Sequence, residues 1–95
     1  MPQANNMTEI TIYTIDACPY SELAKELLRR HSMPYREVVV PMEDDALWDF
    51  LIARSGRRTM PQVFVGDVFV ASHAELRALV SAGALSQKCR AGRLP

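Results

Sequence analysis

Residues 10–40 read ITIYTIDACPYSELAKELLRRHSMPYREVVV, and this stretch decides the fold. It opens with β-branched residues in alternation, which predicts a strand over 9–14. A helix is predicted from Pro19, because proline suits the first helical position and apolar residues then recur every three or four positions. The run 35–40 predicts a second strand, and its three consecutive valines are typical of a strand buried on both faces. Strand, helix and strand together predict a right-handed βαβ unit.

The helix that begins at Pro19 is amphipathic. Its apolar positions predict one buried stripe, made of Leu23, Ala24, Leu27 and Leu28. Charged residues three or four positions apart predict ion pairs on the solvent face, namely Glu22–Lys25, Glu26–Arg29 and Glu26–Arg30.

The second half of the chain predicts a helix, a hairpin and a last helix. Acidic residues at 43–45 suit the first turn of a helix that Gly56 is placed to end. One face of that helix is marked by Leu47, Phe50, Leu51 and Arg54. A Gly-Asp pair separates the apolar runs 62–65 and 68–71, which is the spacing of a two-residue hairpin turn. Residues 72–75 read SHAE, a capping-box pattern that predicts the start of the last helix.

Length and composition bound the class of protein. The chain has 95 residues, 48% of them hydrophobic, and its 11 basic residues equal its 11 acidic ones. This favours one soluble domain and argues against a nucleic-acid or membrane-surface partner. Two cysteines make no disulfide framework, and the expected compartment is cytoplasmic. The expected organisation is a flexible segment over 1–8, a domain over 9–86 and a basic tail over 87–95.

Cys18 lies where the first predicted strand passes into the first helix. A helix N-terminus carries about half a positive charge and unpaired N–H donors, and it favours the thiolate form of a cysteine. We therefore expect Cys18 to act as a nucleophile. Ser21 stands where a second cysteine would make a dithiol. Its hydroxyl either donates a hydrogen bond to the Cys18 thiolate or is an ordinary serine of the first helical turn.

Three segments, in this order and spacing, resemble the glutaredoxin family. Cys18-Pro19-Tyr20-Ser21 matches the family's Cys-Pro-Tyr-Cys with the last cysteine changed. Residues 58–64 (RTMPQVF) are similar to its Thr-Val-Pro segment, and residues 70–76 (VASHAEL) stand where it usually has two glycines before an acidic helix start. The resemblance covers about 9–85. It implies the thioredoxin-like α/β fold, whose elements follow one another along the chain in the order βαβαββα. In this fold a central four-stranded mixed sheet is flanked by three or more helices.

The resemblance implies a glutathione-dependent thiol–disulfide oxidoreductase that works with one thiol. Cys18 would attack the glutathione sulfur of a protein–glutathione mixed disulfide, and a second glutathione would regenerate the enzyme. Pro19, Tyr20 and Ser21 complete the catalytic segment, with Tyr20 expected to be exposed as a substrate contact. The Met60–Pro61 peptide bond is implied to be cis and to face Cys18.

Glutathione, as the co-substrate, has an implied binding site. The backbone N–H groups of His73 and Ala74 would bind its γ-glutamyl carboxylate at a helix N-terminus, with Glu75 near its amine. Arg57 and Arg58 remain to hold its glycine carboxylate, because Ile15 and Trp48 stand where the family commonly offers basic or polar groups. The other implied contacts are Thr59, Met60, Pro61 and Ser72. Trp48 either walls the groove with Ile15 or is a partly buried helix residue.

Two alternatives of other classes stay open. Two chains and two glutathiones could share a [2Fe–2S] cluster through Cys18, as some single-cysteine relatives do, or the chain could be a glutaredoxin-fold interaction protein with weak redox activity. Partners are expected to be glutathione and glutathionylated proteins. A monomer is expected unless a cluster is bound, and a small thiol other than glutathione would also fit. No Cys/His spacing suggests zinc. Cys89 is either an incidental thiol or a remote partner of Cys18.

Overall fold

Seven elements succeed one another in the computed structural model, which describes residues 9–83. They are β1 (Ile10–Thr14), α1 (Pro19–Arg30), β2 (Tyr35–Val39), α2 (Asp45–Ser55), β3 (Gln62–Val65), β4 (Val68–Ala71) and α3 (His73–Ser81). This is the predicted order. The predicted segments 1–8 and 87–95, together with Cys89, lie outside the described residues.

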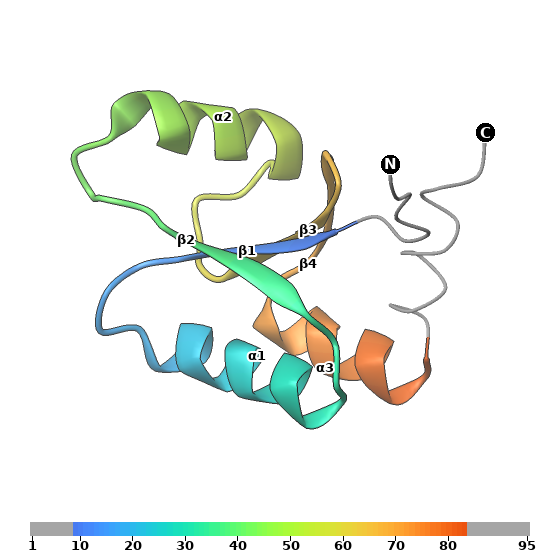
Figure 1. Cartoon of the computed structure of the whole chain (residues 1–95). Helices are drawn as coiled ribbons and strands as arrows, with labels where there is room; N and C mark the ends of the chain where they lie inside the picture. The colour runs from blue at the N-terminus through green and yellow to red at the C-terminus, as the bar shows by residue number, and fades with distance from the viewer. Residues whose placement is uncertain (1–8, 84–95) are drawn as a thin grey trace, which may run out of the picture.

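The four strands form one mixed sheet in the order β2-β1-β3-β4. β1 and β2 are parallel, with Ile10 opposite Tyr35 and Thr14 opposite Val39. β3 pairs antiparallel with both β1 and β4. Figure 1 shows α1 and α3 on one face of the sheet and α2 on the other. The predicted four-stranded mixed sheet flanked by three or more helices is therefore confirmed.

Each face of the sheet has its own hydrophobic core. The core between the sheet and helices α1 and α3 is formed by Ile10, Ile12, Ala24, Leu28, Val63, Val65, Ala71, Leu76 and Val80. The core between the sheet and α2 is formed by Val40, Trp48, Leu51 and Phe64. Alternation along β1 and β3 sends successive side chains to opposite faces, which is why Val63 and Phe64 belong to different cores. The sheet is thus the common wall of both cores.

Caps close the helices largely as their sequences indicate. The Asp44 side chain accepts a hydrogen bond from the Leu47 N–H at 3.1 Å and caps α2, which ends at Gly56 in the left-handed conformation. On α1 the three predicted ion pairs are present, with N···O distances of 3.0 Å for Glu22–Lys25, 3.0 Å for Glu26–Arg29 and 3.9 Å for Glu26–Arg30.

Within residues 9–83, no helix has the length and apolar content needed to cross a bilayer.

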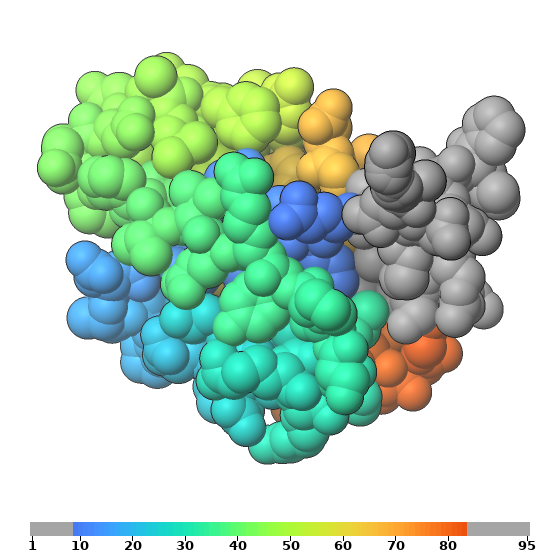
Figure 2. Space-filling view, in the orientation of Figure 1, coloured from blue at the N-terminus to red at the C-terminus, as the bar shows by residue number. Residues whose placement is uncertain are grey.

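Two predictions about burial are wrong. The valine run in β2 is not buried on both faces, because Val39 is 47% exposed. β2 is an edge strand, and Figure 2 shows its residues at the surface between those of α2 and α1. Leu23 was expected in the buried stripe of α1 and is 51% exposed, whereas Ala24 and Leu28 are fully buried. On α2 the buried side chains are those of Trp48 and Leu51, while Phe50 is 37% exposed.

Candidate functional site

Strand register brings three segments to one end of the sheet. Gln62, the first residue of β3, pairs with Tyr13 near the end of β1. Ala71, the last residue of β4, pairs with Val63. The loop that carries Cys18, the Met60–Pro61 bond and the start of α3 therefore leave the sheet at the same end.

Cys18 is the N-cap residue of α1. Its carbonyl accepts hydrogen bonds from the N–H groups of Ser21 at 3.1 Å and Glu22 at 3.2 Å, and Pro19 occupies the first turn. The Cys18 side chain makes no capping hydrogen bond and is half-buried. Ala17, directly before it, has a φ of 56°, in the left-handed region that residues other than glycine seldom adopt. Cys18 thus lies at the positive end of a helix and is partly exposed.

Ser21 points its hydroxyl into the protein. The residue is 1% exposed, and its Oγ has no hydrogen-bond partner among residues 9–83. The structure therefore shows no hydrogen bond from Ser21 to Cys18, one of the two roles that the sequence left open. Cys18 is the single free cysteine in the described part of the chain, so no second thiol stands at this helix start.

Tyr20 and His73 join the starts of α1 and α3. Tyr20 is 59% exposed, as expected of a substrate contact, and its ring centroid lies 5.5 Å from that of His73 with the planes tilted by 41°. This contact places the first turn of α3 directly beside the Cys18 segment. The predicted catalytic segment and the predicted His73 and Ala74 site therefore border one another.

Glu75 is held by partners from within the protein. Its carboxylate accepts hydrogen bonds from the Ser72 N–H at 3.0 Å, as part of the predicted capping box, and from both terminal nitrogens of Arg57 at 2.9 Å. The Arg57 guanidinium, followed by the Ser72 N–H, lowers the pKa of Glu75 from 4.5 to about 2. The same pairing raises the pKa of Arg57, whose guanidinium also lies 5.1 Å from the Phe69 ring centroid.

The adjacent Arg57 and Arg58 have different surroundings. Arg57 was expected to hold a ligand carboxylate, and in the structure its guanidinium is paired with Glu75. Arg58 is exposed, lies 5.4 Å from the Trp48 ring centroid, and has no carboxylate within 4.0 Å in the described residues. Of the two, Arg58 is the guanidinium left for a ligand.

Buried Gln62 fixes the loop that precedes β3, a role that the sequence analysis missed. Its side-chain amide donates hydrogen bonds to the carbonyls of Arg57 at 3.1 Å and Thr59 at 3.0 Å. The Met60–Pro61 bond that follows this loop is cis, as the resemblance implied. A glutamine at the start of an otherwise apolar strand was the available signal, since a buried amide needs partners.

The family model described as Glutaredoxin matches residues 10–70, more than half of the chain. The chain belongs to the glutaredoxin family. Glutaredoxin 3 of Escherichia coli K12 is 35% identical over 80 residues, which are 83% of this chain and 94% of the relative. The glutaredoxin of Pseudomonas aeruginosa is 33% identical over 79 residues, covering 83% and 93% of the two chains.

Solved glutaredoxins share the fold. The solution structure of a glutaredoxin from Brucella melitensis has a TM-score of 0.77 and 34% identity, covering 98% of this chain and all of that one. A buckwheat glutaredoxin–glutathione complex has a TM-score of 0.76, with 93% and 83% coverage, but only 21% identity. These likenesses confirm the thioredoxin-like fold of glutaredoxins, and membership makes the protein a thiol–disulfide oxidoreductase.

Trp48, which was expected either to wall the groove or to be a partly buried helix residue, lies in the core. It is 4% exposed, and its indole N–H donates to the Pro41 carbonyl at 3.2 Å. Ile15 packs against the same cluster and is half-buried. Burial therefore favours the interpretation of Trp48 as a helix core residue over that of a groove wall.

A second network, also missed from the sequence, ties down the strand that leads to Cys18. The buried Thr14 hydroxyl donates to Glu37 at 2.7 Å, and Lys25 of α1 donates to the same carboxylate at 3.0 Å. The Thr14 hydrogen bond, more than that of Lys25, lowers the pKa of Glu37, while Glu22 and Glu37 raise the pKa of Lys25. β1, β2 and α1 are thus joined by one carboxylate just below the site.

Residues 9–83 of one chain do not by themselves supply the ligands of an iron–sulfur cluster. A [2Fe–2S] cluster takes four thiolate ligands or their equivalents. Residues 9–83 supply one, Cys18, and contain no group of three His, Cys, Asp or Glu side chains arranged to hold a metal ion. The shared-cluster alternative would take one Cys18 from each of two chains and its other two thiolates from glutathione.

Proposed function

We propose that this glutaredoxin reduces mixed disulfides between glutathione and protein thiols, with Cys18 as the only redox-active thiol. The observation that carries the proposal is the Cys18 segment itself, a half-buried cysteine capping α1 with a buried serine, Ser21, in the fourth position. Serine cannot form a disulfide, so no internal disulfide can close at this helix start. The chemistry available is exchange through an intermolecular mixed disulfide.

The proposed cycle has two balanced steps. The Cys18 thiolate attacks the glutathione sulfur of the substrate, the substrate's S–S bond breaks, and the protein thiolate leaves and takes a proton from solvent. A glutathione thiolate then attacks the glutathione sulfur of the Cys18–glutathione disulfide. Cys18 leaves as the thiolate, and oxidised glutathione is released. Each step forms one S–S bond and breaks one.

We propose that glutathione lies along the three segments that meet at this end of the sheet. Arg58 is the available guanidinium for a carboxylate, because Arg57 is bound to Glu75. The backbone N–H groups of His73 and Ala74 lie in the first turn of α3, where a helix offers them no carbonyl partner of its own, and they suit the second carboxylate. The residues in this proposal are Cys18, Pro19, Tyr20, Ser21, Arg58, Thr59, Met60, Pro61, Ser72, His73, Ala74 and Glu75. Glutathione is the proposed thiol because the buckwheat structure of the same fold is a glutathione complex.

The proposed setting is the cytoplasm, where a glutathione pool keeps a lone thiol reduced. The proposed partners are glutathione and glutathionylated proteins, with the protein acting as a monomer.

Turnover of a glutathione mixed disulfide, coupled to glutathione reductase, tests the proposal. We expect Cys18→Ser to abolish turnover, because it removes the nucleophile, and Cys89→Ser to retain wild-type turnover. Mass spectrometry of the oxidised protein should find one glutathione on Cys18. Loss of turnover in Cys89→Ser, or a Cys18–Cys89 disulfide in place of the adduct, would contradict a monothiol mechanism.

A further inference from the structure

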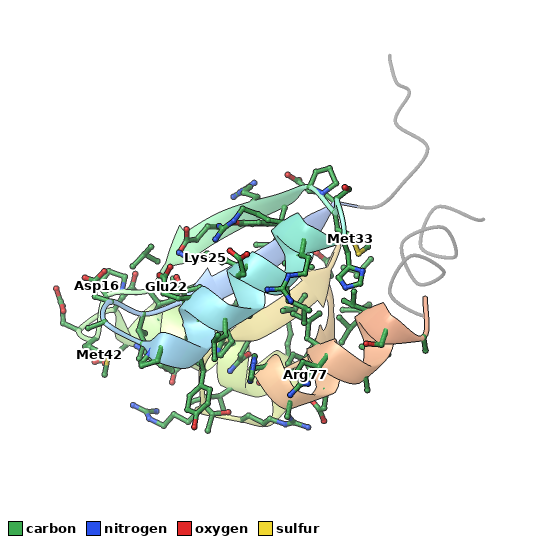
Figure 3. The ribbon with its side chains drawn as sticks, turned by 90° about the horizontal axis from the view of Figure 1, so that it is seen from below. Asp16, Glu22, Lys25, Met33, Met42 and Arg77 are labelled. Atoms are coloured by element: carbon green, nitrogen blue, oxygen red, sulfur yellow. The ribbon has the colours of Figure 1, made fainter. Side chains whose placement is uncertain are left out.

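A groove runs between α1 and α3 beside the Cys18 segment. It has a volume of about 230 Å³, and its lining is Leu23, Glu26, Leu27, Arg30, His73 and Arg77. Figure 3 shows α1 and α3 side by side on this face of the molecule, with Arg77 on α3. His73, which borders Tyr20, makes this groove continuous with the redox site.

An apolar strip on α1 leads from the redox site into the groove. Tyr20, Leu23 and Leu27 follow one another along α1 at spacings of three and four, so they lie on one face of the helix. Tyr20 and Leu23 are 59% and 51% exposed. Large apolar side chains left exposed side by side next to a reactive group are typical of a surface that binds a partner.

The rim of the groove is positively charged. Arg77 has no carboxylate within 4.0 Å in the described residues. Arg30 has one, Glu26, at 3.9 Å, and that carboxylate is closer to Arg29, at 3.0 Å. Glu26 is thus shared between two arginines, and Arg30 and Arg77 leave the rim with an excess of positive charge that favours an anionic group.

We propose that this groove docks the polypeptide of a protein substrate, in a segment with an apolar residue near the substrate cysteine and an acidic residue farther along. The proposal goes beyond the proposed reduction by glutathione, and it requires of the chemistry only that Cys18 exchange disulfides. Apolar side chains of the segment would cover Leu23 and Leu27, and its carboxylate would lie between Arg30 and Arg77, which line the same groove.

The dimensions give the spacing of that acidic residue. Arg30 follows Cys18 by twelve positions, which is about 18 Å along a helix at roughly 1.5 Å per residue. An extended peptide covers the same distance in about five or six residues. We therefore expect the acidic residue five or six positions from the substrate cysteine.

Peptides activated as mixed disulfides with thionitrobenzoate test the docking without glutathione. Attack of Cys18 on the peptide sulfur forms the Cys18–peptide disulfide and releases the coloured thionitrobenzoate thiolate. Two peptides share a leucine beside the cysteine and carry either glutamate or lysine five positions away. Rates are divided by the rate of the same variant with the thionitrobenzoate disulfide of mercaptoethanol. We expect the glutamate peptide to react about fivefold faster or more at low salt, since a charge-assisted hydrogen bond is gained.

Matched variants assign the preference to the groove. Arg77→Glu should abolish or reverse it, Leu23→Ser should slow both peptides, and Arg54→Glu, the same charge change on α2, should leave the preference intact. Equal rates for the two peptides, or equal effects of Arg77→Glu and Arg54→Glu, would overturn the proposal. So would a dimer in light scattering that Leu23→Ser dissociates, because a second copy would then occupy the groove. Amide chemical-shift changes caused by the cysteine-to-serine form of the glutamate peptide give a measurement independent of Cys18 reactivity, and their absence from α1 and α3 would equally overturn it.

Discussion

The Ser21 hydroxyl is a buried polar group close in sequence to the nucleophile, and it has no hydrogen-bond partner among residues 9–83. A buried hydroxyl without a hydrogen bond costs about 1–3 kcal/mol relative to water. We therefore expect Ser21→Ala to raise the free energy of unfolding by about 1 kcal/mol, measured by urea denaturation of the reduced protein. Helix propensity adds to the effect, since alanine is the better helix former. A lower unfolding free energy in Ser21→Ala would show that the hydroxyl has a partner in solution, with the Cys18 sulfur the first to examine.

Single residues were predictable where their role is local. Pro19 as the first helical residue, Gly56 as the left-handed cap and Ser72 with Glu75 as a capping box all follow from neighbours within four positions, and all are present. The pairing of Arg57 with Glu75 spans 18 positions and leaves no local pattern. Adjacent arginines near a site thus indicate a ligand, but only the fold shows which of the two is already paired with a carboxylate of the protein.

At the level of elements, the Arg57–Glu75 pair joins the loop before β3 to the start of α3. The pKa of Glu75 is about 2 in the folded protein and 4.5 in the reference state. A carboxyl group whose folded pKa is depressed stabilises the protein above its unfolded pKa, and the stabilisation is lost as pH falls through the folded value. We expect wild type to be more stable than Glu75→Gln at pH 7, with the difference shrinking from about pH 5 to pH 2.

Urea unfolding at several pH values measures that difference. Glu75→Gln in an Arg57→Gln background is the control, because Arg57 is the largest cause of the depressed pKa. The pH-dependent part should be smaller in that background. An equal pH dependence in both backgrounds would mean that the Ser72 N–H, and not Arg57, holds the carboxylate.

Elements were predictable in kind and order but not in exposure. Hydrophobic periodicity identifies the face of a helix and the presence of a strand. It carries no information on how far the covering layer extends, which is why Leu23 and Val39 were misplaced. Leu23 lies on the turn of α1 that faces the groove, and Val39 lies on an edge strand. The exposed position of Leu23 is itself what makes the groove apolar.

At the scale of the whole molecule, one sheet separates the two hydrophobic cores. Trp48, the single tryptophan of the chain, reports on the α2 core, whereas Leu28 of α1 is fully buried in the opposite one. β1 and β3 contribute to both, through Ile12 and Val63 on one face and Phe64 on the other. Loss of the α1 core should therefore remove the support of the α2 core as well.

We expect Leu28→Ala to lower the free energy of unfolding by about 2–5 kcal/mol, the usual cost of a cavity at a fully buried leucine. Because the strands are shared, Trp48 fluorescence and far-ultraviolet circular dichroism should give the same urea midpoint in wild type, and both midpoints should fall together in Leu28→Ala. Leu51→Ala, on the Trp48 side, is the matched variant and should shift both signals equally. A Trp48 transition that stays in place while the circular dichroism midpoint falls would instead mean that the α2 layer unfolds separately from the redox face.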